Sequence, residues 1–207
     1  MRFLKQGRIV AAALGLSALF AAPAHAAEIA NPYNCAPQPT LAQSFAPWGD
    51  LAYYTPVPNA GLENGSTGWT LFGGAKVVTG NEPWKIGGAT HSHALELAAG
   101  AVAISAPLCI DETYPHFRFF VRNAGLITGA LKIEVLYLDS SGKIVNTKPY
   151  DYKAALPAWA PTGLVGIDVF TPKTTVAAAP VAFRFTAMGV GPRFQIDDVY
   201  VDPRMAR

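Results

Sequence analysis

From residue 59 onward, apolar and polar side chains alternate over short runs that turn-forming residues separate. The alternation is clean over residues 131–135, and segments 117–119 and 183–185 each place an arginine between two phenylalanines. A period of two with one polar face is typical of antiparallel strands that bury one side in a core. The pattern therefore predicts an all-β domain from residue 59 to residue 203.

About nine short strands account for the pattern, at residues 69–78, 94–98, 101–106, 116–123, 130–138, 143–148, 164–170, 181–187 and 194–201. The turn-forming segment 139–142 predicts a hairpin between the fifth and sixth of these strands. No segment predicts an amphipathic helix, because the 19 glycines and 17 prolines interrupt the apolar runs. Strands of this length and spacing predict a two-sheet antiparallel β-sandwich, and we expect a jelly roll.

The first 26 residues have the three-part pattern of a secretory signal peptide. Three basic residues precede the apolar run 9–22, and the small-x-small site Ala24-His25-Ala26 follows it. The run is about 14 residues long, which is too short to span a bilayer comfortably. We therefore expect a secreted, extracellular protein that begins after Ala26 and has no membrane span.

The charges of the chain are nearly balanced, with 16 Lys and Arg against 14 Asp and Glu. Loss of the three basic residues of the predicted signal peptide would leave 13 against 14. A near-neutral chain without a basic run is a poor candidate for binding nucleic acid or an anionic membrane surface. A hydrophobic content of 51% also excludes an intrinsically disordered chain.

Residues 27–58 are rich in proline and in aromatic side chains. Prolines at this density prevent a regular helix or a central strand, whereas the aromatic rings argue against a free linker. We therefore expect an extended arm that lies on the domain. Cys35 in this arm and Cys109 in the domain form an even pair, which in an exported protein predicts one disulfide. A redox or metal-binding thiol pair is the alternative, but neither cysteine has a second cysteine or a histidine nearby in the sequence.

Three segments together carry a family resemblance. Segment 59–69 reads NAGLENGSTGW, segment 92–97 reads SHALEL, and segment 194–202 reads FQIDDVYVD. Over about residues 57–203 the chain resembles carbohydrate-binding modules of the family 4, 9 and 22 type, which have a galactose-binding-like jelly roll. Leu62 stands where those modules usually have Phe, and Ala94 interrupts their Ser-Leu-x-Leu pattern. The resemblance implies that the chain binds a polysaccharide or a cell-wall glycan.

A calcium site also follows from this resemblance. Side-by-side first and last strands would bring Glu63 near Asp197 or Asp198, and two buried carboxylates without partners repel each other at high cost. Calcium accepts six or more oxygen ligands and would remove that cost. The related modules hold a structural Ca2+ at this place, which implies Glu63 and Asp197 as ligands, with Asp198 as the alternate. Strand alternation predicts that Asp197 shares the inward face of Val199. The other possibility is that these acids are solvated or pair with arginines.

The candidate sugar-binding residues are aromatic. Trp84 follows Asn81 and Glu82 in a predicted loop, where a large ring has no obvious core to fill. An exposed ring can stack on the apolar face of a sugar while polar neighbours bind its hydroxyls. We therefore expect Trp84, Asn81 and Glu82 to contact the ligand. Tyr150 and Tyr152 form a second aromatic cluster that we expect to be exposed.

Arg118 and Arg122 are predicted to lie on one strand face with Phe120 between them. Such a face could line a sugar-binding groove, which makes Arg118 a further candidate contact, or it could be a salt-bridged outer face. His91 and His93 have the spacing of a pair of metal ligands, but no third ligand is visible near them in the sequence.

The motifs of common hydrolases are not found in this sequence, including Gly-x-Ser-x-Gly and His-Glu-x-x-His. We therefore expect a protein that is not an enzyme and that binds a glycan without changing it. Two alternatives stay open. The first is a cell-surface structural or interaction protein of the same fold that binds no sugar, and the second is a small jelly-roll hydrolase or lyase.

Overall fold

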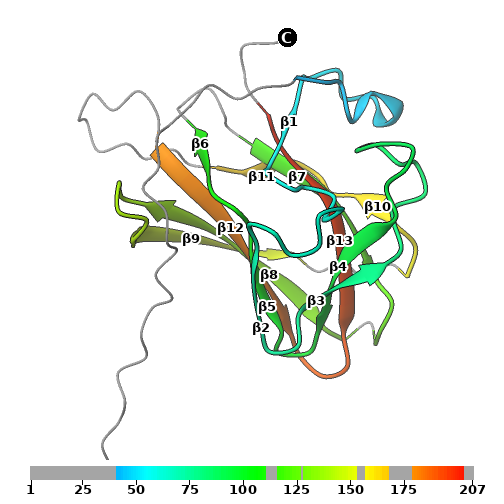
Figure 1. Cartoon of the computed structure of the whole chain (residues 1–207). Helices are drawn as coiled ribbons and strands as arrows, with labels where there is room; N and C mark the ends of the chain where they lie inside the picture. Colours follow the sequence, from blue (N-terminus) through cyan, green and yellow to red (C-terminus); the bar gives the residue numbers. More distant parts are fainter. Residues whose placement is uncertain (1–40, 111–115, 127, 153–156, 168–178, 203–207) are drawn as a thin grey trace, which may run out of the picture.

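The computed structural model describes residues 41–110, 116–126, 128–152, 157–167 and 179–202. These residues form two antiparallel sheets packed face to face, and within the described ranges the helical structure is one short 3-10 helix, η1 (Ala46–Trp48) (Figure 1). The predicted antiparallel β-sandwich is thereby confirmed. The predicted signal peptide and Cys35 lie outside the described residues. In the part of the chain that is described, no helix is long and apolar enough to cross a membrane.

One sheet has seven strands. Its path runs through β10 (Ala160–Pro161), β7 (His116–Asn123), β13 (Arg193–Asp202), β4 (His93–Ala98) and β3 (Lys76–Thr79). Two short strands complete it, since β1 (Thr55–Pro56) pairs with β13 and β11 (Val165–Gly166) pairs with β7.

The other sheet has six strands. Its path runs through β2 (Thr70–Phe72), β5 (Val102–Ile104), β12 (Ala179–Met188), β8 (Ala130–Leu138) and β9 (Ile144–Tyr152), and β6 (Leu108–Ile110) pairs with β12.

The core lies between the sheets and is built by the alternation seen in the sequence. Phe117 and Phe119 of β7 and Phe183 and Phe185 of β12 are all fully buried between the sheets. The rings of Phe117 and Phe183 stack across the core with centroids 4.2 Å apart. Burial of each such ring contributes on the order of 2 kcal/mol, so these four side chains join the two layers.

Several strand predictions are confirmed to the residue, such as 116–123 and 130–138. The single strand predicted at 69–78 is wrong. Gly73 and Gly74 have φ of 62° and 88°, and this turn carries the chain from β2 in the six-stranded sheet to β3 in the seven-stranded sheet. Glycine adopts that left-handed conformation without steric cost. The strands β1, β6 and β10 were missed because each is only two or three residues long.

The described part of the predicted arm, from residue 41, lies against the outer face of the seven-stranded sheet. Phe45 and Tyr54 of this segment are fully buried there, against Phe120 of β7 and Tyr200 of β13. The rings of Phe45 and Phe120 stack with centroids 5.4 Å apart. The segment is therefore a packed layer outside the sheet, and it lies close to the loop between β3 and β4 (Figure 1).

Strand β13 contains a β-bulge that changes which side chains face the core. Its register with β7 shifts between Asp197 and Tyr200, and Asp198 has a left-handed φ of 49°. A bulge inserts one extra residue and reverses the alternation beyond it. Asp197 therefore pairs with the outward-facing Phe120, whereas Val199 faces the core. The prediction that Asp197 shares the inward face of Val199 is wrong for this reason.

Candidate functional site

A group of aromatic rings lies on the outer face of the seven-stranded sheet, centred on Phe120 of β7. The ring centroid of Phe120 is 5.3 Å from that of Trp48 and 5.6 Å from that of Trp84. The rings of Trp48 and Trp84 meet edge to face at 4.8 Å. Trp84 is 44% exposed, whereas Phe120 beneath it is fully buried. We call the three outer rings, Trp48, Trp84 and Trp159, the tryptophan patch.

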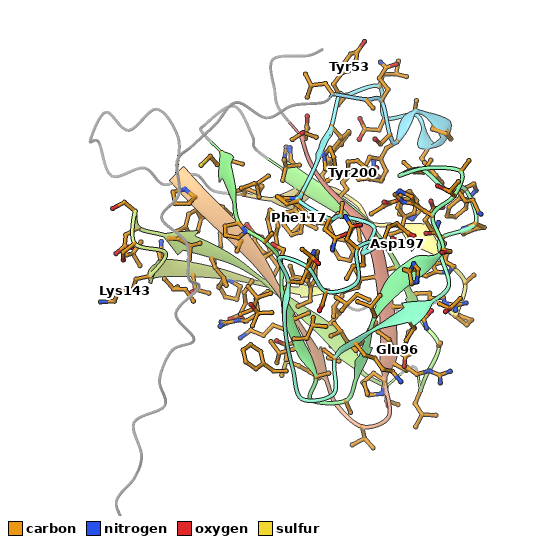
Figure 2. All side chains as sticks on the ribbon, viewed as in Figure 1. Tyr53, Glu96, Phe117, Lys143, Asp197 and Tyr200 are labelled. Atoms are coloured by element: carbon orange, nitrogen blue, oxygen red, sulfur yellow. The ribbon has the colours of Figure 1, made fainter. Side chains whose placement is uncertain are left out.

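Trp84 is held in place by the buried carboxylate of Glu82. One oxygen of Glu82 accepts a hydrogen bond from the backbone N–H of Trp84 at 2.6 Å, and the other accepts one from the N–H of Ile86 at 2.5 Å. The backbone N–H of Glu82 in turn donates to Asp197 Oδ2 at 3.0 Å. Figure 2 shows the loop between β3 and β4 beside Asp197. Glu82 was predicted to contact the ligand, but it is fully buried, so it positions the Trp84 loop instead.

Asn81 has a similar local role. Its side-chain amide donates to the carbonyl oxygen of Glu82 at 2.8 Å, and the residue is only partly exposed. Local hydrogen bonds of this kind fix the conformation of a loop. The structure therefore places both polar neighbours of Trp84 where they shape the loop, and leaves the tryptophan ring at its surface.

The two adjacent aspartates of β13 differ in their surroundings. Burial raises the pKa of Asp197 to about 9, and the neighbouring charge of Asp198 adds to the rise. Both oxygens of Asp197 accept backbone hydrogen bonds, from Glu82 and from Asp198. Burial also raises the pKa of Asp198, to about 6, although the N–H of Gly87 partly offsets it. Burial therefore disfavours the charged form of Asp197 more strongly than that of Asp198.

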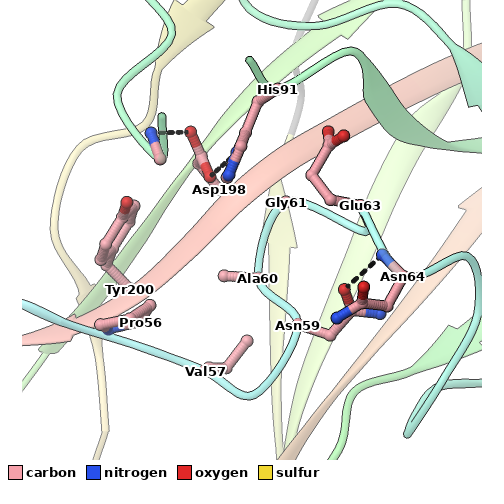
Figure 3. A pocket seen from close by; sticks show the side chains of 11 residues that line it. Pro56, Val57, Asn59, Ala60, Gly61, Glu63, Asn64, His91, Asp198 and Tyr200 are labelled. Atoms are coloured by element: carbon pink, nitrogen blue, oxygen red, sulfur yellow. Dashed lines mark hydrogen bonds and ion pairs between the residues drawn. The ribbon is translucent and has the colours of Figure 1, made fainter. Parts of the chain in front are cut away.

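A cavity of about 250 Å³ opens between the segment after β1 and the bulge of β13 (Figure 3). Its lining includes Asn59, Gly61, Glu63, His91 and Asp198. Asp198 Oδ1 and His91 Nδ1 are both buried without a hydrogen-bond partner, and they lie 3.9 Å apart. A buried carboxylate oxygen in that position is costly unless a cation or a donor approaches it.

The predicted calcium ligands fit this cavity unequally. Glu63 lines it together with Asp198, which was predicted as the alternate ligand. Asp197, the first predicted partner of Glu63, faces the Trp84 loop. The carboxylate of Glu63 accepts hydrogen bonds from the N–H groups of Ser92 and His93, at 2.8 and 2.9 Å. Across the described ranges, no three His, Cys, Asp or Glu side chains converge to hold a metal ion. The atom that fits a cation is Asp198 Oδ1, with backbone carbonyls and water as the further ligands that calcium accepts.

Arg118 and Arg122 do share a face of β7, but their surroundings differ. Arg118 is buried, donates to Asp50 Oδ2 and to the carbonyl oxygen of Thr162, both at 2.8 Å, and lies over the ring of Phe45. The salt-bridged alternative therefore describes Arg118, which anchors the arm and does not reach the surface as the predicted ligand contact. Arg122 is partly exposed, and its guanidinium lies 5.2 Å from the ring centroid of Trp159.

The second predicted aromatic cluster lies in the other sheet. Tyr150 is on β9 of the six-stranded sheet, packs against the core and has a buried hydroxyl, whereas the side chain of Tyr152 lies outside the described residues. Tyr150 and Trp84 therefore belong to different layers and do not form one site. Cys109 is on β6, and its predicted disulfide with Cys35 stays a prediction because Cys35 is not described.

Sequence reasoning missed Trp48 and Trp159 as members of the surface around Trp84. It placed Arg122 on a strand face that could line a groove, but it chose Arg118 as the candidate contact. The signal for Arg122 was its alternation with Phe120, which places both on one face of the strand. The other two were not predictable from spacing, since Trp48 comes from the arm and Trp159 from the residue before β10.

No family model and no curated protein matches this chain. Among solved structures it is similar to tailspike protein 4 of bacteriophage CBA120, with 19% identity over 71% of this chain and 21% of that chain, and a TM-score of 0.49. It is similar to TmCBM61 in complex with β-1,4-galactotriose, with 18% identity over 71% of this chain and 97% of that chain, and a TM-score of 0.43.

A third similar structure is the pair of CBM22-1 and GH10 modules of Clostridium thermocellum xylanase 10B, complexed with xylohexaose. The identity is 19% over 72% of this chain and 28% of that chain, with a TM-score of 0.47. The similar structures thus include carbohydrate-binding modules, and this chain spans less than a third of the tailspike and xylanase chains. Because each TM-score is below 0.5, the fold described above rests on the strand pairing of this chain itself.

Proposed function

We propose that this chain is a secreted, non-catalytic protein that binds a polysaccharide through the tryptophan patch. The observation that carries the proposal is the 44% exposure of Trp84 on a loop that is held in place by hydrogen bonds to the buried Glu82 carboxylate. A large apolar ring is costly to expose, and flat rings suit the apolar C–H faces of sugars. The buried layer of Phe45 and Phe120 beneath the patch keeps the rings in position before a ligand arrives.

A non-catalytic role is supported by the state of the acids near Trp84. Glu82 and Asp197 are fully buried and bound to backbone N–H groups. General acid–base catalysis needs a carboxyl group within hydrogen-bond reach of the bond that reacts. The acids beneath the patch therefore suit a supporting role.

Calcium is a second part of the proposal. We place the ion at Asp198 Oδ1, in the cavity that Glu63 also lines. The ion would neutralise the buried carboxylate of Asp198, whose Oδ2 accepts the N–H of Gly87 at 2.8 Å. It would therefore stabilise the far end of the loop that carries Trp84.

Secretion would remove residues 1–26 and allow the disulfide between Cys35 and Cys109 to form. The mature protein, purified from the culture medium, would begin at residue 27. Its intact mass would rise by two hydrogen masses on reduction. A first residue at Met1, or a mass that reduction leaves unchanged, would remove this part of the proposal.

The test of glycan binding is retention of the mature protein on a panel of soluble and insoluble polysaccharides. We expect retention on at least one glycan, and loss of retention in Trp84→Ala. Phe72→Ala is the matched control, because Phe72 is 43% exposed but lies on β2 of the other sheet. A protein that no glycan retains would favour the cell-surface interaction alternative. Release of sugar fragments from a retained glycan would favour the hydrolase or lyase alternative.

A further inference from the structure

A row of polar side chains crosses the outer face of the seven-stranded sheet beside the tryptophan patch. Arg122 of β7, Gln195 of β13, Glu96 of β4 and Lys76 of β3 lie opposite one another in the strand register. Arg122 Nε donates to Gln195 Oε1 at 2.7 Å, and Gln195 Nε2 donates to Glu96 Oε2 at 2.8 Å. Lys76 Nζ completes the row at 3.4 Å from Glu96 Oε1. The row is therefore one connected network across four strands.

The exposed charge of this row is positive. Arg193 adds a third cation, with its Nε 3.9 Å from Glu96 Oε2. The side chains of Lys76 and Arg193 are 63% and 55% exposed, whereas that of Glu96 is only 12% exposed. Lys76 and Arg193 thus flank the one carboxylate of the row, and Arg122 is linked to it through Gln195. An anion approaching from solvent therefore meets an excess of positive charge, although the whole chain is close to neutral.

The row and the tryptophan patch form one surface. Arg122 follows Phe120 by two residues on the same face of β7, and Phe120 contacts the ring of Trp84. The guanidinium of Arg122 also lies against Trp159, the third ring of the patch. A ligand that stacks on the patch can therefore reach Arg122 without leaving the surface.

We propose that the glycan bound here is anionic, with carboxylate groups of the kind that uronic acids carry. This inference rests on the proposed function and names its substrate class. A guanidinium presents parallel N–H donors that match a carboxylate, and stacking on a ring keeps those donors oriented. Strands lie about 4.8 Å apart, so Arg122 and Lys76 are separated by three strand spacings, roughly 14 Å. An extended uronate chain carries a carboxylate on every ring and meets cations at both ends of the row.

The main comparison of the test is between polygalacturonate and its uncharged methyl ester, and three further glycans serve as controls. Affinity electrophoresis or calorimetry of the mature protein is run with polygalacturonate, with its fully methyl-esterified form, with dextran sulfate and with the neutral glycans xylan and galactan. We expect binding to polygalacturonate at least about 10-fold tighter than to the methyl ester, because charge-assisted hydrogen bonds are the stronger class. Binding should weaken as salt rises.

Variants of the row assign the charge to its residues. Arg122→Gln should lose about 10- to 100-fold in affinity for polygalacturonate. Arg122→Lys should lose less, because lysine keeps the positive charge although it lacks the paired N–H donors of the guanidinium. Arg193→Gln removes a second cation of the row, whose side chain is 55% exposed. Lys148→Gln is the matched control, since its ammonium lies 5.1 Å from the ring centroid of Tyr150 on the other sheet. An unchanged thermal midpoint shows that a variant is folded.

Each outcome separates this inference from the proposed function. Equal binding to acidic and neutral glycans would overturn the anionic specificity and leave glycan binding in place. Binding to none of the glycans would overturn both. Binding to dextran sulfate that is as tight as binding to polygalacturonate, and that Arg122→Gln does not change, would mean simple ion exchange. That result would also overturn the inference.

Discussion

The backbone N–H of Glu82 donates to Asp197 Oδ2 over 3.0 Å and joins two segments that are 115 residues apart in the sequence. Glu82 lies in the loop between β3 and β4 that presents Trp84, and Asp197 precedes the bulge of the last strand. The exposed ring is therefore positioned by a buried polar contact and not by its own packing alone. Several consequences of this arrangement can be measured.

Glu82→Gln should destabilise the fold by about 1–3 kcal/mol, because a neutral amide replaces a carboxylate that accepts two backbone N–H bonds. The same variant should weaken glycan binding, since the loop that carries Trp84 loses its anchor. Denaturant unfolding and glycan titration check the two effects. Wild-type stability in Glu82→Gln would contradict the anchoring role.

Gly87→Ala should also destabilise the fold. A Cβ at Gly87 would lie 2.4 Å from Asp198 Oδ1, so the carboxylate or the loop must move. Overpacking of this kind costs about 1–3 kcal/mol. Gly163→Ala is the matched control, because a Cβ there meets no atom within 4 Å. Thermal unfolding of both variants should show a lower midpoint in Gly87→Ala alone.

Chelation should lower the thermal midpoint of the mature protein if calcium binds at Asp198, because a ligand that binds only the folded state stabilises it. Asp198→Asn should abolish the difference between calcium and chelator. Asp197→Asn should keep it, since both Asp197 oxygens already accept backbone hydrogen bonds. An unchanged midpoint in chelator, with no calcium in elemental analysis, would remove the ion from the account.

Acid should weaken the attachment of the arm, because it protonates Asp50. Burial alone would raise the pKa of Asp50, but hydrogen bonds from Tyr54, Ala52 and Arg118 outweigh it and hold the pKa below 3.8. A lowered pKa in the folded state means that the stabilisation is present above pH 3.8 and is lost as the pH falls through the folded value.

Asp50→Asn should therefore be less stable than wild type at pH 7 by on the order of 1 kcal/mol, and the difference should shrink toward pH 2. Tyr54→Phe removes one of the donors, and its effect should be smaller. Urea unfolding between pH 2 and 7 checks the prediction. A difference between wild type and Asp50→Asn that does not change with pH would contradict it.

The period of two was enough to predict the two sheets and the full length of β7 and β8, because one buried face fixes both the strand and its orientation. It could not predict the bulge at Asp198. The Asp-Asp sequence does not show which residue of the strand adopts a left-handed conformation. Because of the bulge, Asp197 faces outward and not toward the core as predicted.

The candidate site was predictable only where local sequence decides exposure. Trp84 is exposed, as its loop context indicates. Arg118 and Arg122 have the same local sequence pattern, but Arg118 is buried and Arg122 is partly exposed. The arm covers Arg118 through Asp50, and that contact spans 68 residues of sequence. Long-range packing of this kind decides which of two equivalent arginines reaches the surface.

The most direct test of the account is the affinity of Trp84→Ala for the glycan that retains the wild-type protein. Loss of stacking on one exposed ring should weaken binding by about 10-fold, while Phe72→Ala keeps the wild-type Kd. The Trp84→Ala protein should stay folded, with a thermal midpoint lowered only by the lost contacts with Trp48 and Phe120. Unchanged affinity in a folded Trp84→Ala protein would show that the glycan binds elsewhere and would contradict the tryptophan patch as the binding site.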